Sequence, residues 1–347
     1  MRVLVTGHHG YIGSVLVPVL TSADHEVAGI DSDLFAACTF GDDAVSDVTS
    51  LRADVRDIES EHLVGFDAVI HLAAVCNDPV GDLNPRATYE INHRGSVRVA
   101  EQAKAAGVPR FLFSSSCSLY GKAGEEMLDE GAGFAPVSPY GESKVLAERD
   151  ISALADDSFS PTFLRNATAY GVSPRLRADV VVNNLTGFAH TTGEVLIQSD
   201  GTPWRPLVHV EDIAAAFLAV LEAPRELVHD QAFNVGSSAE NYRIRQVAEI
   251  VEEEVPGARA SFAAGAGPDK RSYQVDCSKI VTVLPASKPL WTVRRGVKQL
   301  REAYERHGLT FDRFTGSRYL RINRVKELQE AGRLDDELRW RVPAGVT

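Results

Sequence analysis

Two side chains one helical turn apart form a candidate site for moving protons. The stretch SPYGESKVLAE has a helical pattern and places Tyr140 and Lys144 four residues apart, on one helical face. A tyrosine hydroxyl has a pKa of about 10 and is a poor base at neutral pH. A neighbouring ammonium favours the phenolate and lowers that pKa. The pair therefore indicates acid and base chemistry, although YxxxK alone also arises by chance.

Upstream, the stretch FLFSSSCSLYG (111–121) runs from an apolar strand into four serines and Cys117. A packed core gains nothing from hydroxyls that must each find a partner. We therefore expect this strand to end at a site that handles protons and binds a polar, sugar-sized ligand.

The first turn, TGHHGYIGS, has the spacing GxxGxxG between a strand and a helix. Glycines let the backbone approach a pyrophosphate closely, and a helix N-terminus favours its negative charge. The residues predicted to bind a dinucleotide here are Gly7, Gly10, Tyr11, Ile12 and Gly13. His8 and His9 are interpreted as loop residues, and we expect no metal site.

Asp31 ends the second predicted strand, about 20 residues after the glycines, where an acid binds both ribose hydroxyls. No arginine lies in 32–38 to receive a 2′-phosphate, which favours NAD over NADP. A turn or cap is the alternative role for this carboxylate. Asp54 and Val55 are placed to contact the adenine, and the small strand end Leu72, Ala73 and Ala74 is predicted to lie against the cofactor.

Short apolar runs alternate with helical patterns through the first half of the chain, which predicts an α/β fold with helices on both faces of a parallel sheet. The expected strands are 2–6, 26–30, 68–72, 111–114 and 162–165, and the expected helices are 11–20, 87–106 and 140–155. We therefore predict a Rossmann-type, doubly wound sheet in residues 1–168, to which 207–236 returns. A smaller, mixed substrate-binding domain and tail is predicted for 169–206 and 237–347, with a surface helix at 294–307 and a solvated helix near 324–330.

Composition sets broad limits on the class of protein. The chain has 347 residues, 44% hydrophobic content and a formal net charge of -12, which argues against nucleic acid as a partner. The four cysteines form no CxxC pair, which is typical of reduced thiols in a cytoplasmic enzyme. Met1 leads directly into a strand without a leader pattern, and no run of about 18 apolar residues predicts a membrane span.

These motifs together resemble the extended short-chain dehydrogenase/reductase family, specifically its nucleotide-sugar epimerases and dehydratases. The matching pieces are TGHHGYIG, Asp31, HLAA, Asn92 in YEINHRGS, SSSCSLYG, SPYGESK and LVHVED, which span roughly 1–213. The resemblance implies a tightly bound NAD, with Asn92 and Ser114 on the cofactor side. It also implies a catalytic triad of Ser116, Tyr140 and Lys144, in which Lys144 also holds the nicotinamide ribose.

The two positions after Ser116 discriminate among reactions of this family. The family's 4,6-dehydratases carry Asp-Glu there, whereas this chain has Cys117 and Ser118, so 4,6-dehydration is not expected. The 3,5-epimerising members use a cysteine one residue later. A proton-transfer role for Cys117 is therefore one hypothesis, and a buried thiol facing the core is the other. Cys76 is expected in a loop near the nicotinamide.

Other residues are assigned to the substrate by resemblance. Thr168 takes the place of the family's usual Asn, and Asn184 is the better candidate of the pair Asn183–Asn184. Arg205 and Arg271 resemble arginines that bind a diphosphate, for which a planar guanidinium is suited. Arg175 and Arg177 either line the entrance or are solvated loop residues.

The resemblance implies an NAD-dependent nucleotide-sugar epimerase, most simply one that inverts C4 through a transient 4-keto sugar. The alternatives are a net nucleotide-sugar oxidoreductase, a 5,6-type dehydratase, or a catalytically silent NAD-sensing protein on the same fold. The family also implies a homodimer formed through the helices expected at 87–106 and 140–155.

Overall fold

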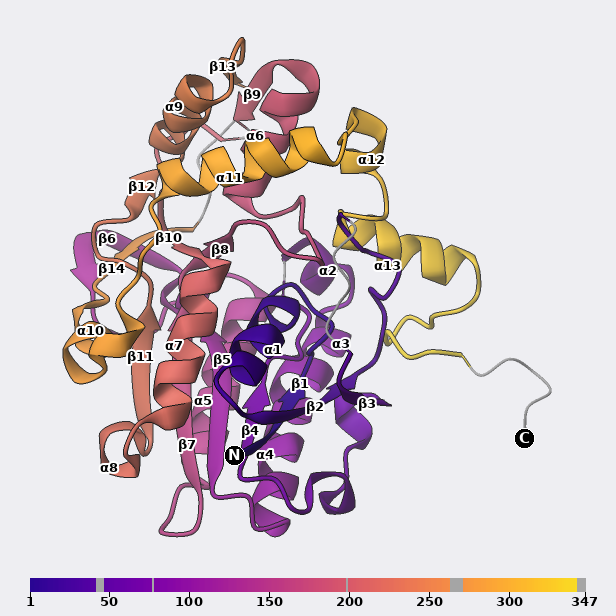
Figure 1. Ribbon diagram of the computed structural model, residues 1–347, viewed down its shortest axis with the longest axis vertical. Coiled ribbons are helices and arrows are strands. Elements are labelled where there is room, and N and C mark those ends of the chain that lie inside the picture. Colours follow the sequence, from indigo (N-terminus) through magenta and orange to yellow (C-terminus); the bar gives the residue numbers. More distant parts are fainter. Residues whose placement is uncertain (42–46, 77, 198, 263–270, 342–347) are drawn as a thin grey trace.

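The computed structural model describes residues 1–41, 47–76, 78–197, 199–262 and 271–341 (Figure 1). Its main element is a seven-stranded sheet of order β11-β7-β5-β4-β1-β2-β3, in which every neighbouring pair is parallel. The strands are β1 Arg2–Thr6, β2 Glu26–Asp31, β3 Thr49–Arg52, β4 Ala68–His71, β5 Arg110–Ser116, β7 Ser160–Asn166 and β11 Gln231–Val235. The order reverses between β1 and β4, so the crevice at their carboxyl ends is where a doubly wound sheet binds its ligand. The Rossmann-type prediction is confirmed.

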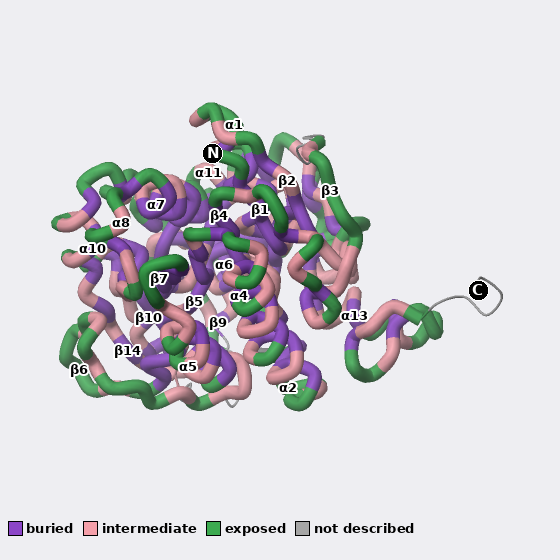
Figure 2. The backbone as a smooth tube through the Cα atoms, turned by 90° about the horizontal axis from the view of Figure 1, so that it is seen from below, coloured by how far each residue is buried: buried purple, intermediate pink, exposed green. Residues whose placement is uncertain are grey.

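Helices cover both faces of this sheet because its strands are buried on both sides. Successive residues of β1 point in opposite directions, so Val3 and Val5 pack with α1 (Gly13–Ser22) and α7 (Val210–Glu222). Leu4 packs on the other face, with α4 (Ser96–Ala105) and α5 (Pro139–Ser152). Figure 2 shows the resulting buried layer running through the sheet.

Residues 85–105 are helical, as expected for 87–106, but they do not form a uniform α-helix. The segment divides into α3 (Pro85–Tyr89), a π-helical turn at Glu90–Gly95, and α4. Such π-helical turns occur frequently at functional sites. Here the turn places Asn92 against the backbone of the loop that follows β4.

Smaller sheets and three long helices form the second region. A three-stranded sheet has the order β12 (Asn241–Arg243), β10 (Trp204–His209), β8 (Thr168–Tyr170). Two further pairs are β9 (Glu194–Ile197) with β13 (Arg259–Phe262) and β6 (Lys122–Leu128) with β14 (Ser272–Val275). Helices α6 (Val181–Thr192), α9 (Ile244–Glu254) and α11 (Val293–Arg306) share a separate core above them (Figure 1). Residues 207–236 were expected to return to the large sheet. Helix α7 and strand β11 do return to it, but strand β10 pairs with β8 and β12 instead.

The tail also differs from its prediction as a solvated helix. After α12 (Phe311–Thr315), helix α13 (Arg321–Glu330) lies beside the first domain (Figure 1). Val325, Leu328, Leu334 and Leu338 are buried in the same core as α4 and α5. The short helices α2 (Asp78–Leu83), α8 (Arg225–Val228) and α10 (Ser278–Val283) complete the described elements. Among the described residues, each helix is too short or too polar to cross a membrane.

Candidate active site

One cavity of about 990 Å³ opens at the carboxyl ends of the parallel strands and continues to β10. Its volume is at the upper end of the usual range for ligand sites. The structure brings into its lining every predicted site residue except Asn92 and Cys117: Gly7, Gly10, Tyr11, Ile12, Gly13, Asp31, Asp54, Val55, Leu72, Ala73, Ala74, Ser114, Ser116, Tyr140, Lys144, Thr168, Asn184, Arg205 and Arg271. Residues that are far apart in the chain thus share one space.

The glycine-rich turn is packed so closely that side chains cannot replace two of its glycines without movement. Gly7 has φ +74°, and a Cβ there would lie 2.7 Å from the backbone nitrogen of Ala73. A Cβ on Gly13 would lie 2.4 Å from the carbonyl oxygen of Gly7. The turn thus exposes its backbone to the cavity at the start of α1, which is the geometry that suits a pyrophosphate.

Two carboxylates lie at the far end of the cavity from β10. Asp31 accepts hydrogen bonds from the amides of His9 (3.1 Å) and Asp33 (2.8 Å). Burial raises the pKa of Asp31, and these amide donors oppose that rise. Burial also acts to raise the pKa of Asp54, but hydrogen bonds from Arg56 bring it below its ordinary value. Both carboxylates line the cavity, and both were expected to contact the adenosine part of the cofactor.

The same turn contains a group of possible metal ligands. His8, His9 and Asp31 offer ligand atoms within 4.8 Å of one another. Burial lowers the pKa of His8 to about 4, so its imidazole is neutral at pH 7.

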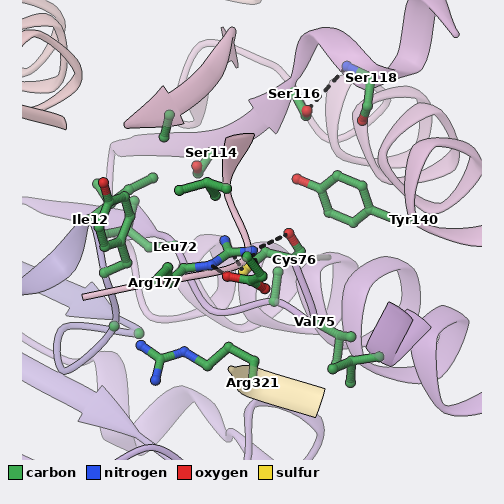
Figure 3. Close-up of a pocket in the computed structure, with 18 of the residues that line it drawn as sticks. Ile12, Leu72, Val75, Cys76, Ser114, Ser116, Ser118, Tyr140, Arg177 and Arg321 are labelled. Atoms are coloured by element: carbon green, nitrogen blue, oxygen red, sulfur yellow. Dashed lines mark hydrogen bonds and ion pairs between the residues drawn. The ribbon is translucent and has the colours of Figure 1, made fainter. Parts of the chain in front are cut away.

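Tyr140 and Lys144 lie one turn apart in α5, as their spacing predicts, and Lys144 contacts the end of β5. In Figure 3 the Tyr140 hydroxyl is directed into the cavity, on the side that carries Ser116 and Ser118. The Lys144 ammonium lies 5.9 Å from the centroid of the Tyr140 ring and donates a hydrogen bond of 2.7 Å to the carbonyl oxygen of Ser114. Burial lowers the pKa of Lys144 to about 8. A cation held this close to the phenol stabilises its anionic form.

Ser116 ends β5 and caps the short 3₁₀ helix that follows, because its Oγ accepts a hydrogen bond of 3.1 Å from the Ser118 amide. Ser118 lines the cavity beside it and was given no role from the sequence. Its hydroxyl is buried and has no hydrogen-bond partner among the described residues. The resemblance offered a signal for Ser118, because the cysteine of the 3,5-epimerising members of the family falls at this position.

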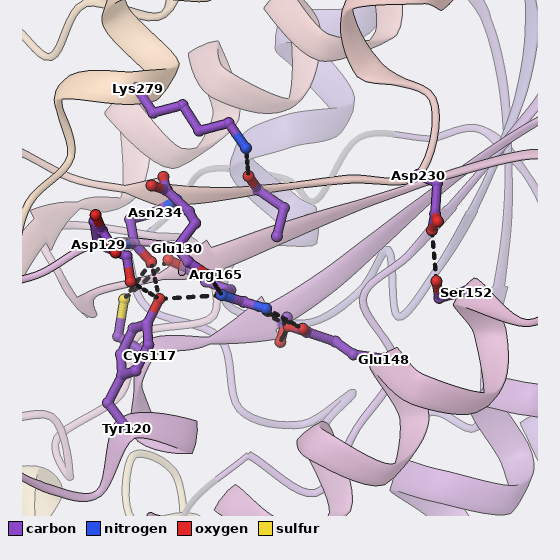
Figure 4. A network of polar contacts seen from close by, with 12 residues as sticks. Cys117, Tyr120, Asp129, Glu130, Glu148, Ser152, Arg165, Asp230, Asn234 and Lys279 are labelled. Carbon is purple, nitrogen blue, oxygen red and sulfur yellow. Dashed lines mark hydrogen bonds and ion pairs between the residues drawn. The ribbon is translucent and has the colours of Figure 1, made fainter. Parts of the chain in front are cut away.

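Cys117 lies outside the cavity, and this corrects the hypothesis of a proton-transfer role. Its side chain is fully buried, and its thiol lies 3.0 Å from the carbonyl oxygen of Arg165. Burial raises the pKa of this thiol well above its ordinary value. In Figure 4 it belongs to a network of polar contacts in which Arg165 forms a buried ion pair of 2.7 Å with Glu148. The position of Cys117 fits the other hypothesis, a buried thiol that faces the core.

Asn92 is likewise absent from the cavity wall, although it was expected to contact the cofactor. Its side chain is fully buried and forms two hydrogen bonds of 2.8 Å with the backbone N–H and C=O of Val75. Val75 lines the cavity. Asn92 therefore holds the loop after β4 in place rather than contacting a ligand.

The predicted substrate residues line the opposite end of the cavity from Asp31. The Arg205 guanidinium donates hydrogen bonds to the carbonyl oxygens of Trp204 and Arg271. Asn184 lines the cavity, whereas Asn183 is buried and accepts a hydrogen bond of 2.9 Å from the Gly171 amide. The preference for Asn184 agrees with these positions.

Two further arginines, Arg177 and Arg321, line the cavity. Arg177, for which a solvated loop was an open alternative, is buried and forms an ion pair of 2.9 Å with Asp179. Arg321 reaches the cavity from the tail, together with Val325 and Leu338. No local motif marks these tail residues, and the helical spacing of Val325 and Leu328 was the available signal that the tail has a buried face.

Comparisons with known proteins agree with this geometry. Residues 3–236 match the model of the NAD dependent epimerase/dehydratase family. The UDP-glucose 4-epimerase of Corynebacterium glutamicum is 31% identical over 271 residues, which cover 73% of this chain and 80% of that protein.

Two solved structures have similar folds and include NAD. MoeE5 in complex with UDP-glucuronic acid and NAD is 27% identical, with a TM-score of 0.76, covering 88% of this chain and 99% of that one. The UDP-glucose 4-epimerase of Thermus thermophilus, in complex with NAD, is 25% identical, with a TM-score of 0.74 and the same coverage. The protein is thus an NAD-dependent enzyme, and the chain belongs to the NAD dependent epimerase/dehydratase family.

Proposed function

We propose that the protein is a nucleotide-sugar epimerase that inverts C4 through a transient 4-keto sugar. The observation that carries the proposal is the position of Tyr140, Ser116 and Lys144 in one continuous cavity. The glycine-rich turn lies at one end of that cavity, and Arg205 and Arg271 lie at the other. This order matches a dinucleotide and a nucleotide sugar whose reacting ends meet beside the tyrosine.

The residues present fit NAD. The turn at Gly7–Gly13 offers backbone N–H groups to the pyrophosphate, and Asp31 accepts from the ribose hydroxyls. When bound, NAD supplies the redox chemistry by accepting a hydride and returning it.

The chain's own residues handle the protons. Tyr140 takes the proton of the C4 hydroxyl as that carbon is oxidised, and it returns the proton to the keto oxygen on reduction. Ser116 offers a hydroxyl that orients the same substrate oxygen. Lys144, fixed to the carbonyl oxygen of Ser114 at 2.7 Å, keeps a positive charge beside the phenolate. Inversion follows when the keto sugar presents its other face before reduction.

The relatives support a nucleoside diphosphate sugar as the substrate. The Corynebacterium relative is named a UDP-glucose 4-epimerase, and MoeE5 was solved with UDP-glucuronic acid. In this chain, Arg205 and Arg271 suit a diphosphate because a guanidinium bonds two phosphate oxygens at once.

The test is to incubate purified protein with UDP-, dTDP-, GDP- and CDP-sugars, without added NAD, and to identify products by NMR. We expect a C4 epimer with no net change in NADH absorbance, and we expect none from a Tyr140→Phe variant that retains NAD. Accumulation of a stable keto product, stoichiometric NADH formation or loss of water would contradict the proposal and favour the oxidoreductase or dehydratase alternatives.

We also propose that the protein forms a homodimer through the π-helical turn with α4 and through α5, which pack against one another in the chain. Light scattering in solution should give twice the mass of 37.6 kDa. A monomer at micromolar concentration would contradict this assembly.

A further inference from the structure

The tail places a buried cation in the cavity, and that cation has an unused donor. The Arg321 side chain is 4% exposed and lines the cavity. Its Nη2 donates a hydrogen bond of 2.9 Å to the carbonyl oxygen of Arg175, and its guanidinium lies 4.5 Å from the centroid of the Phe35 ring. Its Nη1 has no hydrogen-bond partner among the described residues. A buried donor left unpaired is costly, so this geometry calls for an acceptor in the cavity.

The surroundings of Arg321 identify the part of the cavity it serves. Arg175 donates hydrogen bonds to the carbonyl oxygens of His9 (3.1 Å) and Ala36 (2.5 Å). Arg321 is thereby connected to the glycine-rich turn and to the segment that follows Asp31. In Figure 3 its guanidinium lies on the same side of the cavity as Ile12 and away from the Tyr140 hydroxyl.

The charges around Arg321 favour an anionic ligand. Among the described residues, Arg321 forms no ion pair, and the Asp179 carboxylate, whose charge also acts on Arg321, is paired with Arg177 at 2.9 Å. A buried guanidinium that lacks an anionic partner is unfavourable. A phosphate near the glycine-rich turn supplies the missing charge and accepts from Nη1 in the same contact.

We propose that Arg321 binds the pyrophosphate of NAD, so that the C-terminal segment 316–341 forms part of the dinucleotide site. The inference rests on the NAD site of the proposed function, and it is independent of the sugar and of the carbon inverted. Arg321 lies outside residues 3–236, which match the family model, so the residue is a feature of this chain's tail.

Further contacts attach the same segment to the adenosine end of the site. The Trp340 indole N–H donates a hydrogen bond of 2.6 Å to the carbonyl oxygen of Ser32, and Arg56 donates one of 2.8 Å to that of Glu337. Val325 and Leu338 line the cavity from this segment. The tail therefore covers the end of the cavity where Asp31 and Asp54 lie, while Arg321 reaches the phosphates.

The test compares Arg321→Met with Lys326→Met, which removes an exposed charge from the same helix. Titration calorimetry on the full chain measures the affinities for NAD, ADP-ribose, adenosine and UDP, after bound dinucleotide has been removed and its absence has been checked by the protein's absorbance at 260 nm. We expect Arg321→Met to weaken NAD and ADP-ribose roughly 10- to 100-fold, as for loss of a charge-assisted hydrogen bond, and to leave adenosine and UDP within about threefold. Lys326→Met should bind all four like the original chain.

Unchanged NAD affinity in Arg321→Met would overturn the inference. Equal losses for adenosine and ADP-ribose would also overturn it, because they would indicate a collapsed site rather than a lost phosphate contact. A loss confined to UDP would assign Arg321 to the substrate's diphosphate instead. If Arg321→Met does not fold, Arg321→Gln decides by the same criteria, since its amide can still donate to Arg175. These binding measurements stand whether or not any sugar in the panel is epimerised.

Discussion

Replacing Gly13 by alanine separates two physical effects of opposite sign. Gly13 is the first residue of α1, and alanine in a helix is favoured over glycine by about 0.5–1 kcal/mol. Helix propensity alone thus predicts a more stable protein. The new Cβ, however, would lie 2.4 Å from the carbonyl oxygen of Gly7 and 2.6 Å from the Cα of His8. Ordinary contacts begin at 3.4 Å, so the turn must open by roughly 1 Å.

Because the crowded atoms belong to the backbone, no rotamer change relieves the overlap. Overpacking of this kind costs about 1–3 kcal/mol, which exceeds the gain in helix propensity. Moving the turn also displaces N–H groups that face the cofactor's pyrophosphate. Loss of one charge-assisted hydrogen bond, about 1.5–3 kcal/mol, corresponds to roughly a 10- to 100-fold weaker NAD affinity.

Chemical denaturation and NAD titration of Gly13→Ala measure the two effects separately. Gly124→Ala is the control, because a Cβ at this exposed glycine meets nothing within 4 Å. We expect Gly13→Ala to be less stable by about 1–2 kcal/mol and to bind NAD at least tenfold more weakly, with the control near the original values. A Gly13→Ala protein that is more stable and binds NAD normally would refute the close-packed turn.

Three further predictions concern the residues around β5. Tyr140→Phe should lower kcat roughly 10²- to 10⁴-fold while the content of bound NAD stays the same, and a small loss of kcat would contradict its role in proton transfer. Burial lowers the pKa of Lys144 from 10.5 to about 8, so its side chain is charged below pH 8 and neutral above it. We therefore expect kcat to fall as the pH rises through about 8. A kcat that stays constant up to pH 9.5 would contradict this role of the charge. Glu148→Gln should lower the free energy of unfolding, measured by urea titration, by about 3–5 kcal/mol, because it leaves the buried Arg165 without its carboxylate. Cys117→Ala should leave kcat, measured in steady-state assays, unchanged, because the thiol bonds a backbone carbonyl outside the cavity.

The elements that position the site could be predicted from sequence because their signals are local. The strand at 2–6 agrees with β1, the glycine spacing marks the turn, and the four-residue separation places Tyr140 and Lys144 on one face of α5. Each of these inferences needs only a period or a spacing within about ten residues. Their convergence on one cavity then follows from the rule that ligands bind at the carboxyl ends of parallel strands.

The errors arose where long-range packing decides the structure. The helix expected at 87–106 contains a π-helical turn, in which the Asn92 side chain bonds the backbone of Val75, 17 residues away, and no local signal marks that contact. Strand β10 joins β8 rather than the large sheet, and strand pairing of this kind carries no local signal. The tail was expected to be solvated because it is rich in Arg, Glu and Asp, yet Val325 and Leu328 form a narrow buried stripe.

Net charge is a coarse guide, because it describes the whole surface and not the cavity. The chain carries -12 overall, yet Arg177, Arg205, Arg271 and Arg321 all line one space. Arg321 lies toward the glycine-rich turn, and Arg205 lies at the β10 end with Arg271, whose carbonyl oxygen it bonds. The cavity therefore carries positive side chains that the acidic total conceals, and guanidinium groups suit phosphate-containing ligands.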